Sequence, residues 1–139
     1  MAWDIVYYAL DDESAPAIMF LNACPMRVKA TLLAVLDAVA TAPPPQFSGG
    51  GKWEVMHGDM GGYYEIRVTG PGREQFRLFC ILENADVATL AQCGLPGPVI
   101  AVITGLRKPW RTVFTAADYR YVREMGAAYL ASDPRCIMK

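Results

Sequence analysis

Arg67 and Arg77 stand in the stretch GGYYEIRVTGPGREQFRLFC, residues 61–80, each inside an apolar or aromatic run typical of a strand. The TGPG turn between the two runs predicts a hairpin that makes the arginines cross-strand neighbours. Like charges so placed repel each other unless an anion lies between them. A planar guanidinium suits a phosphate, so the pair predicts a phosphate-binding site. Glu65 is the internal alternative, because its carboxylate shares a strand face with Arg67.

Basic and aromatic residues also gather where the last strand-like run ends, in ITGLRKPWRTVF, residues 103–114. Arg107, Lys108 and Arg111 fall within five residues, with Trp110 among them. Basic side chains interleaved with an aromatic ring can bind backbone phosphates and stack an unpaired base. The alternative is an ordinary solvated turn with Trp110 in the core. Beside the arginine pair, the RNA-binding interpretation is preferred.

Few other ionisable residues are candidates. Lys52 follows a glycine-rich loop, and His57 is the only histidine. A lone histidine is most often structural, but its unperturbed pKa near neutrality makes His57 a candidate acid or base. The four cysteines form no C-x-x-C pair and so lack the spacing of a zinc site. We expect no metal and no cofactor.

Composition and charge predict one domain over residues 1–139. The chain is 53% hydrophobic and 19% charged, with a net charge of −1. Residues 99–139 carry seven basic and three acidic side chains, whereas residues 1–51 carry two and five. Such segregation can create a basic patch on a nearly neutral protein. The start of the sequence does not have a leader pattern, and no apolar run approaches the length of a membrane span, so we expect a cytoplasmic protein away from membranes.

The hydrophobic pattern predicts the elements that must position these groups. A β-branched and aromatic run over 3–10 predicts a strand, and two helices follow, one within 11–24 and one from Pro25. A last helix starts at Thr115, where TAAD resembles a capping box. Between them, strand-like runs cover 52–57, 62–68, 74–83 and 98–106, the last two separated by the apolar stretch 84–97. We expect an α+β domain: a mostly antiparallel sheet of four or five strands backed by helices on one face, two N-terminal and one C-terminal.

In their order and spacing, these motifs resemble the HigB-like, phage-related branch of the RelE toxin superfamily. Members carry a lysine and a YE-x-R strand, then an R-x-F strand, then an apolar strand closing on a basic turn with lysine, then a helix. The matching segments are GGKWEVMHGDMGGYYEIRV, REQFRLFCILE and VIAVITGLRKPWRTVFTAADYRYVREMGAAYL. The resemblance spans roughly residues 25–131 and includes the order of the elements.

This resemblance implies a RelE-like fold and the toxin of a type II toxin–antitoxin pair. Such toxins are metal-independent endoribonucleases that usually cut mRNA on the ribosome and so inhibit translation and growth. The expected partners are a cognate antitoxin of the helix-turn-helix type and mRNA. The catalytic positions map onto Arg67, Arg77 and Lys108. Candidates for RNA contact are Lys52, Tyr63, Arg107, Trp110 and Arg111, with His57 as a possible acid or base.

Two other functional classes stay open. One is a binding-only toxin that acts on a protein target, as ParE relatives of the same fold do, and the other is an inactive relative that serves as an antitoxin partner. A convergent set of Arg67, Arg77 and Lys108 favours the nuclease, because a surface that only binds protein does not require it. The slightly acidic net charge favours the inactive relative.

Overall fold

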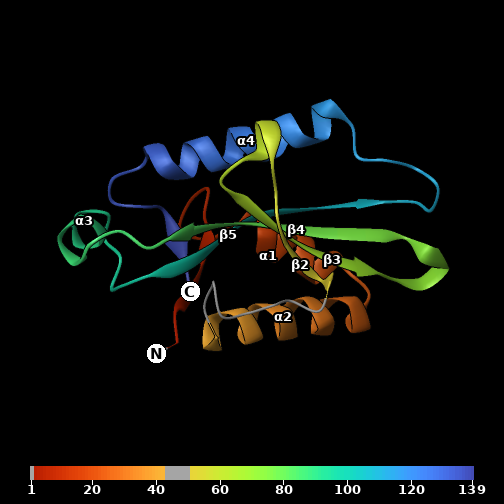
Figure 1. Ribbon diagram of the computed structural model, residues 1–139, viewed down its shortest axis with the longest axis horizontal. Coiled ribbons are helices and arrows are strands. Elements are labelled where there is room, and N and C mark those ends of the chain that lie inside the picture. The colour runs from red at the N-terminus through yellow and green to blue at the C-terminus, as the bar shows by residue number, and fades with distance from the viewer. Residues whose placement is uncertain (1, 43–50) are drawn as a thin grey trace.

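The computed structural model describes residues 2–42 and 51–139 and has the α+β architecture expected from the sequence. Helices pack on both sides of a central sheet (Figure 1). The strands of the sheet are β1 (Asp4–Tyr8), β2 (Trp53–Val55), β3 (Tyr63–Thr69), β4 (Gln75–Glu83), β5 (Val99–Lys108) and β6 (Ile137–Met138). The helices are α1 (Pro16–Ala23), α2 (Met26–Thr41), α3 (Val87–Gln92) and α4 (Ala116–Ala131), with short 3-10 turns η2 (Gly58–Met60) and η3 (Pro71–Arg73).

The sheet has the strand order β2-β3-β4-β5-β1-β6. Only the pairing of β1 with β5 is parallel among the described strands, so the expectation of a mostly antiparallel sheet is confirmed. The expectation of four or five strands was too low, because the described residues form a sheet of six. The additional strand is β6, whose Ile137 pairs with Tyr8 at the edge of β1. A strand of two residues is too short to show an alternating hydrophobic pattern, so the sequence does not predict it.

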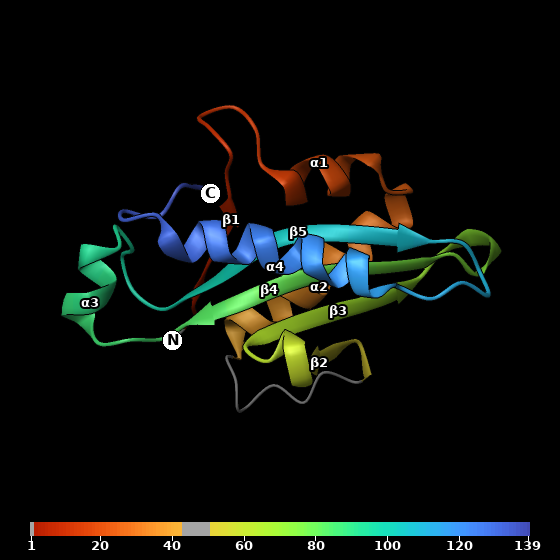
Figure 2. The same cartoon turned by 90° about the horizontal axis from the view of Figure 1, so that it is seen from above.

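Helices cover both faces of the sheet, not one face as the sequence analysis expected (Figure 1). The reason lies in β4 and β5, whose apolar runs bury residues on both sides. Phe76 and Leu78 of β4 lie in the core with α1 and α2, whereas Phe79 and Ile81 lie in the core with α4. From above, α4 crosses the sheet and α1 lies along β5 (Figure 2).

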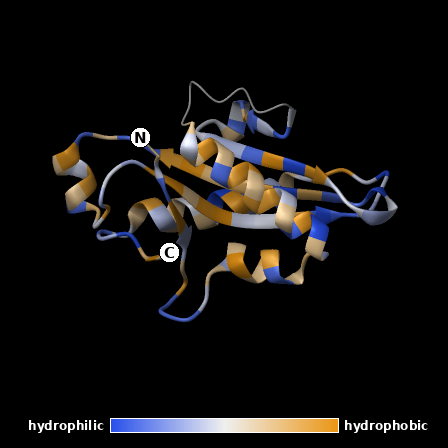
Figure 3. Cartoon of the chain, turned by 90° about the horizontal axis from the view of Figure 1, so that it is seen from below, coloured by the Kyte–Doolittle hydropathy of each residue, from blue (hydrophilic) through white to orange (hydrophobic). Residues whose placement is uncertain are grey.

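The β3–β4 turn packs back onto the core, which fixes the register of the hairpin. Gly72 has a φ of 66°, the left-handed conformation that glycine adopts at little cost. At Gly70, a Cβ would lie 2.5 Å from Cε1 of Phe76 and 2.9 Å from Cγ2 of Val28. Hydrophilic residues lie at this end of the sheet (Figure 3).

The capping box at the start of α4 is confirmed. Thr115 Oγ1 accepts a hydrogen bond from the amide of Asp118 at 3.2 Å, and Asp118 Oδ2 accepts one from the amide of Thr115 at 2.7 Å. The stretch 84–97, expected as a connection, contains α3, which Asp86 caps by accepting from the amide of Thr89 at 2.9 Å. Across the described ranges, no helix is both long enough and apolar enough to span a membrane.

Candidate functional site

Arg67 of β3 and Arg77 of β4 lie directly opposite each other in the antiparallel register, as the sequence predicts. Both share a strand face with residues of the core beneath α4, Tyr63 on β3 and Phe79 on β4. The hairpin turn extends past the start of that helix (Figure 1). The Arg67 side chain is 43% exposed, whereas Arg77 is half-buried. The structure therefore places two guanidiniums beside each other on one face of the sheet.

Two glutamates accompany Arg67. Its Nη1 lies 3.0 Å from Oε2 of Glu54, and its Nε lies 3.7 Å from Oε1 of Glu65. Glu54 pairs with Glu65 across the β2–β3 ladder, so the carboxylates come from neighbouring strands. Arg67 therefore has an internal counter-ion. The carboxylate of Glu54 lies closer to its guanidinium than that of Glu65, the residue that the sequence suggests.

Arg77 makes a different set of contacts. Its Nη1 donates to the Phe76 carbonyl at 3.1 Å and its Nη2 to Oε1 of Gln75 at 3.2 Å. The guanidinium lies 5.5 Å from the centre of the Phe114 ring, a cation–π contact. Burial lowers the pKa of Arg77 from its ordinary value, and the Glu65 carboxylate offsets part of that change. Within residues 2–42 and 51–139, no carboxylate forms an ion pair with Arg77.

Glu65 is an acid of the site whose pKa is shifted upward. Burial raises the pKa of its carboxyl above the ordinary value, although the guanidiniums of Arg77 and Arg67 oppose the rise. Its Oε2 is buried and has no hydrogen-bond partner among the described residues. The side chain is 13% exposed, and a carboxyl with a raised pKa next to two cations has the chemistry of a proton acceptor.

Tyr119 was missed by the sequence analysis, although it lies in the first turn of α4 beside these groups. Its ring contacts Phe79 edge-to-face at 6.2 Å. Burial raises the pKa of the Tyr119 phenol, the Glu65 carboxylate raises it further, and Arg77 lowers it. The apolar stripe of α4 contains Val122 and Tyr129, and its extension back by one turn would have identified Tyr119.

A pocket of about 340 Å³ opens beside Arg77. It contains two guanidiniums and two aromatic rings, and every one of its residues comes from β4, α4 or the β5–α4 connection. The lining residues are Gln75, Arg77, Arg111, Thr112, Val113, Phe114 and Tyr119.

Trp110 lies against Arg111, one of the residues that line this pocket, and is 46% exposed. The guanidinium of Arg111 lies 4.4 Å from the centre of the Trp110 ring, and that of Arg73, from the β3–β4 turn, lies 4.6 Å from it. The alternative that Trp110 belongs to the core is therefore wrong. Arg73 was not singled out from the sequence because its contact with Trp110 joins two separate turns.

Lys108 ends β5 on the same face of the sheet, paired with Gln75. Its Nζ lies 3.0 Å from Oδ2 of Asp118, the residue that also completes the α4 capping box. Lys108 thus contributes to holding the start of α4, and with it Tyr119, against the sheet.

Arg107 points to the opposite face, so the structure does not bring it to the predicted RNA-contacting group. Its guanidinium binds both oxygens of Glu74, at 2.6 and 2.9 Å, and donates to the Ala23 carbonyl at 3.1 Å. It also lies 4.8 Å from the centre of the Phe76 ring. Neighbouring residues of a strand alternate between faces, which separates Arg107 from Lys108.

The remaining candidates are dispersed. Tyr63 is only 8% exposed and packs under α4, where a Cβ at Gly126 would collide with its hydroxyl, so it belongs to the core and does not face RNA. Lys52 is exposed just before β2, and its carbonyl accepts from the amide of Arg67 at 2.8 Å. His57 lines a second pocket that shares Tyr119 with the first.

No protein-family model, no curated protein and no solved structure matches this chain. The likeness to RelE/HigB-like toxins consequently rests on the motifs of the sequence. Among the residues that the structure describes, no group of three or more His, Cys, Asp and Glu side chains is arranged to hold a metal ion.

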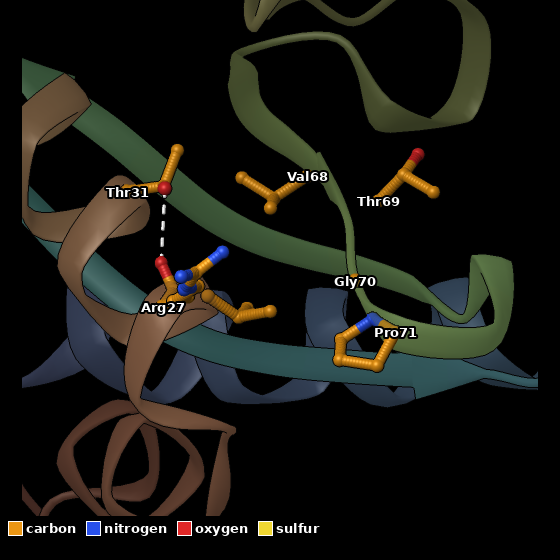
Figure 4. A pocket seen from close by; sticks show the side chains of 7 residues that line it. Arg27, Thr31, Val68, Thr69, Gly70 and Pro71 are labelled. Atoms are coloured by element: carbon orange, nitrogen blue, oxygen red, sulfur yellow. Dashed lines mark hydrogen bonds between the residues drawn. The ribbon is translucent and has the colours of Figure 1, made fainter.

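A further pocket, of about 320 Å³, lies on the other face, between α2 and the end of β3 (Figure 4). Arg27, Thr31 and Pro71 are among its lining residues, and Thr31 Oγ1 donates to the Arg27 carbonyl at 2.9 Å. Arg27 is its single ionisable residue, and the pocket includes none of the candidates from the sequence. It therefore provides a cation without a neighbouring acid or base.

Proposed function

We propose that this protein is a toxin of the RelE/HigB-like type, a metal-independent endoribonuclease that cleaves mRNA, in association with the ribosome, and thereby inhibits translation. The observation that carries the proposal is the Glu65 carboxyl, which is 13% exposed and lies beside the cross-strand guanidiniums of Arg67 and Arg77. A proton acceptor next to cations is the minimum that metal-free RNA cleavage requires.

In the proposed reaction, Glu65 removes the proton from an RNA 2′-hydroxyl. The 2′-oxygen attacks the adjacent phosphorus while the bond from phosphorus to the 5′-oxygen breaks, which leaves a 2′,3′-cyclic phosphate and a 5′-hydroxyl. Arg77 and Arg67 stabilise the negative charge that develops on the phosphate oxygens. Tyr119 is assigned as the donor of the proton that the leaving 5′-oxygen takes up, because its phenol lies among the same charges.

RNA outside the scissile linkage would follow the pocket beside Arg77. Arg111 and Arg73 offer guanidiniums for backbone phosphates, and the half-exposed Trp110 ring offers a surface on which a base stacks. The whole chain is slightly acidic, but cations are in excess around this pocket. RNA binding depends on this local charge and not on the net charge of the chain. The role proposed for Lys108 is positional, since its ammonium is bound by Asp118.

A specific observation favours the second candidate, a relative that binds a protein and cleaves nothing. Arg67 and Lys108 both already have carboxylate partners within the protein. Such compensation lowers the net charge that a phosphate would meet. In either case the proposed partner is an antitoxin, of helix-turn-helix type, that covers the face bearing Arg67 and Arg77 in the cytoplasm.

The proposal is tested by expressing the chain alone and together with the small protein encoded beside it, and by incubating the purified chain with RNA. Growth arrest that co-expression relieves, with RNA fragments ending in 2′,3′-cyclic phosphate, is the expected result. Arrest without RNA cleavage, by purified chain or in ribosome-bound mRNA, would favour the binding-only toxin. Normal growth while folded protein accumulates would reject both kinds of toxin.

A further inference from the structure

A second pocket, of about 380 Å³, adjoins the proposed catalytic groups on the other side of Tyr119. Tyr119 lines both this pocket and the one that contains Arg77, so a ligand could extend from one to the other past a single aromatic side chain. The walls come from η2 with the residues before it and from the first turns of α4. The lining residues are Met56, His57, Asp59, Met60, Ala116, Tyr119 and Arg123.

The chemistry of this pocket differs from that of its neighbour. The pocket beside Arg77 contains two guanidiniums and no carboxylate, which suits a phosphate. This second pocket contains one guanidinium, from Arg123, and one carboxylate, from Asp59. Its apolar surface comes from Met56, Met60 and Ala116. A carboxylate would repel a phosphate, whereas apolar walls with a few polar groups suit a flat heterocycle.

The two charged groups are available to a ligand. In the part of the chain that the structure describes, neither Asp59 nor Arg123 forms an ion pair. The Arg123 guanidinium makes a weak hydrogen bond, in which its Nη1 lies 3.6 Å from the sulfur of Met60. Asp59 is exposed, while Met60 beside it is 5% exposed and anchors the segment in the core.

Resting on the proposed function, we infer that this pocket receives the base next to the scissile phosphate and that it selects guanine. Guanine presents two adjacent N–H donors on its Watson–Crick edge, which a carboxylate such as Asp59 accepts together. Its O6 and N7 atoms are the acceptors that a guanidinium such as Arg123 binds in bidentate fashion. The ring of Tyr119 provides a stacking wall between this base and the phosphate.

The test measures binding and cleavage separately. Fluorescent RNA oligonucleotides that differ in one base, each with a 2′-deoxy sugar at the scissile position to block cleavage, are titrated with the wild-type chain and its variants. The wild type should bind the guanine oligonucleotide about tenfold more tightly than the others, and Asp59→Asn and Arg123→Ala should each lose that preference. Arg120→Ala is the matched control, since Arg120 is exposed on the same helix and is not a lining residue. Thermal melting confirms that each variant is folded.

Four outcomes would overturn the inference. Equal affinity of the wild type for all four bases would reject the guanine pocket, and so would a preference for guanine that both variants retain. In either case, cleavage of unmodified RNA by the same preparation would show that the proposed nuclease nevertheless stands. A preference for another base would reject the assignment of Asp59 and Arg123 to guanine. Neither binding nor cleavage by the wild type would reject the pocket and the nuclease together.

Discussion

Arg67 and Arg77 face each other across the β3–β4 ladder, yet among the described residues only Arg67 has carboxylate partners. Their two environments differ accordingly. Arg67 is 43% exposed beside Glu54, whereas Arg77 is half-buried and lines the pocket in which we place the phosphate. This asymmetry separates a cation that is partly neutralised from one that is open to a ligand.

The first prediction compares Arg77→Ala with Arg67→Ala. Arg77→Ala should lower RNA cleavage by about 100-fold or more, because it removes a preorganised cation from the phosphate pocket. It should also cost about 2 kcal/mol of stability through its lost contacts with Phe114 and the Phe76 carbonyl. Arg67→Ala should cost less than about 1 kcal/mol, as exposed ion pairs do. Single-turnover kinetics measure the cleavage rate of each variant, and urea unfolding measures its stability. Full cleavage by either variant would remove that arginine from the mechanism.

The second prediction concerns Glu65→Gln. Cleavage should fall by about 100- to 10,000-fold, the usual contribution of a general base. Stability should change by less than about 1 kcal/mol or increase, because the raised pKa of Glu65 shows that the folded protein favours the uncharged form. Glu54→Gln, on the facing and more exposed strand position, is the matched control and should retain most activity. Equal losses in the two variants would contradict a specific role for Glu65.

The pH dependence of Glu65 should act on stability and on activity in opposite directions. Its folded pKa lies above its unfolded value, so the folded state holds the proton more firmly. As pH rises from about 4.5 through the folded pKa, the wild type should therefore lose stability relative to Glu65→Gln. Over the same interval cleavage should increase, since the base becomes deprotonated. Melting temperatures and cleavage rates across that range check both trends, and parallel melting curves of the two proteins would refute the assigned shift.

The capping box of α4 should matter for catalysis, because it positions Tyr119. Thr115→Ala should cost about 1 kcal/mol of stability. It should also reduce cleavage by about tenfold through displacement of the Tyr119 phenol, as small misplacements do. Glu124→Ala, exposed on the same helix, serves as the control. Thermal melting and cleavage kinetics at a temperature where both variants are folded make the comparison, and unchanged kinetics in Thr115→Ala would exclude this positional role.

Trp110 should contribute to RNA affinity and not to the chemical step. Trp110→Ala should weaken binding of single-stranded RNA by about tenfold, since base stacking on an aromatic ring is worth about 1–3 kcal/mol. The rate at saturating RNA should be unchanged. Leu130→Ala is the control, because Leu130 is also 46% exposed and does not line the pocket beside Arg77. A lower saturating rate with unaltered affinity would place Trp110 in the reaction itself.

Local patterns in the sequence determined most of the elements and the register of the arginine pair. The alternation of apolar residues identified β1, β3, β4 and β5, and the TGPG turn set Arg67 opposite Arg77. The capping box located the start of α4. Each of these features depends on residues close together in the chain, which is why the sequence alone reveals it.

Tertiary structure decided how the elements pack and which side chains share a site. The placement of α4 on the face opposite α2 brought Tyr119 to Glu65 and Arg77, and it buried Tyr63. The alternation of side chains along β5 places Arg107 on the face away from α4, where it binds Glu74. The β3–β4 turn and the β5–α4 connection lie close together, which places Arg73 against Trp110. These contacts join residues distant in sequence, and their formation depends on burial and charge compensation across the whole domain. No local pattern encodes that balance, so only the folded chain shows that Arg77 lines a pocket and that Arg67 has carboxylate partners.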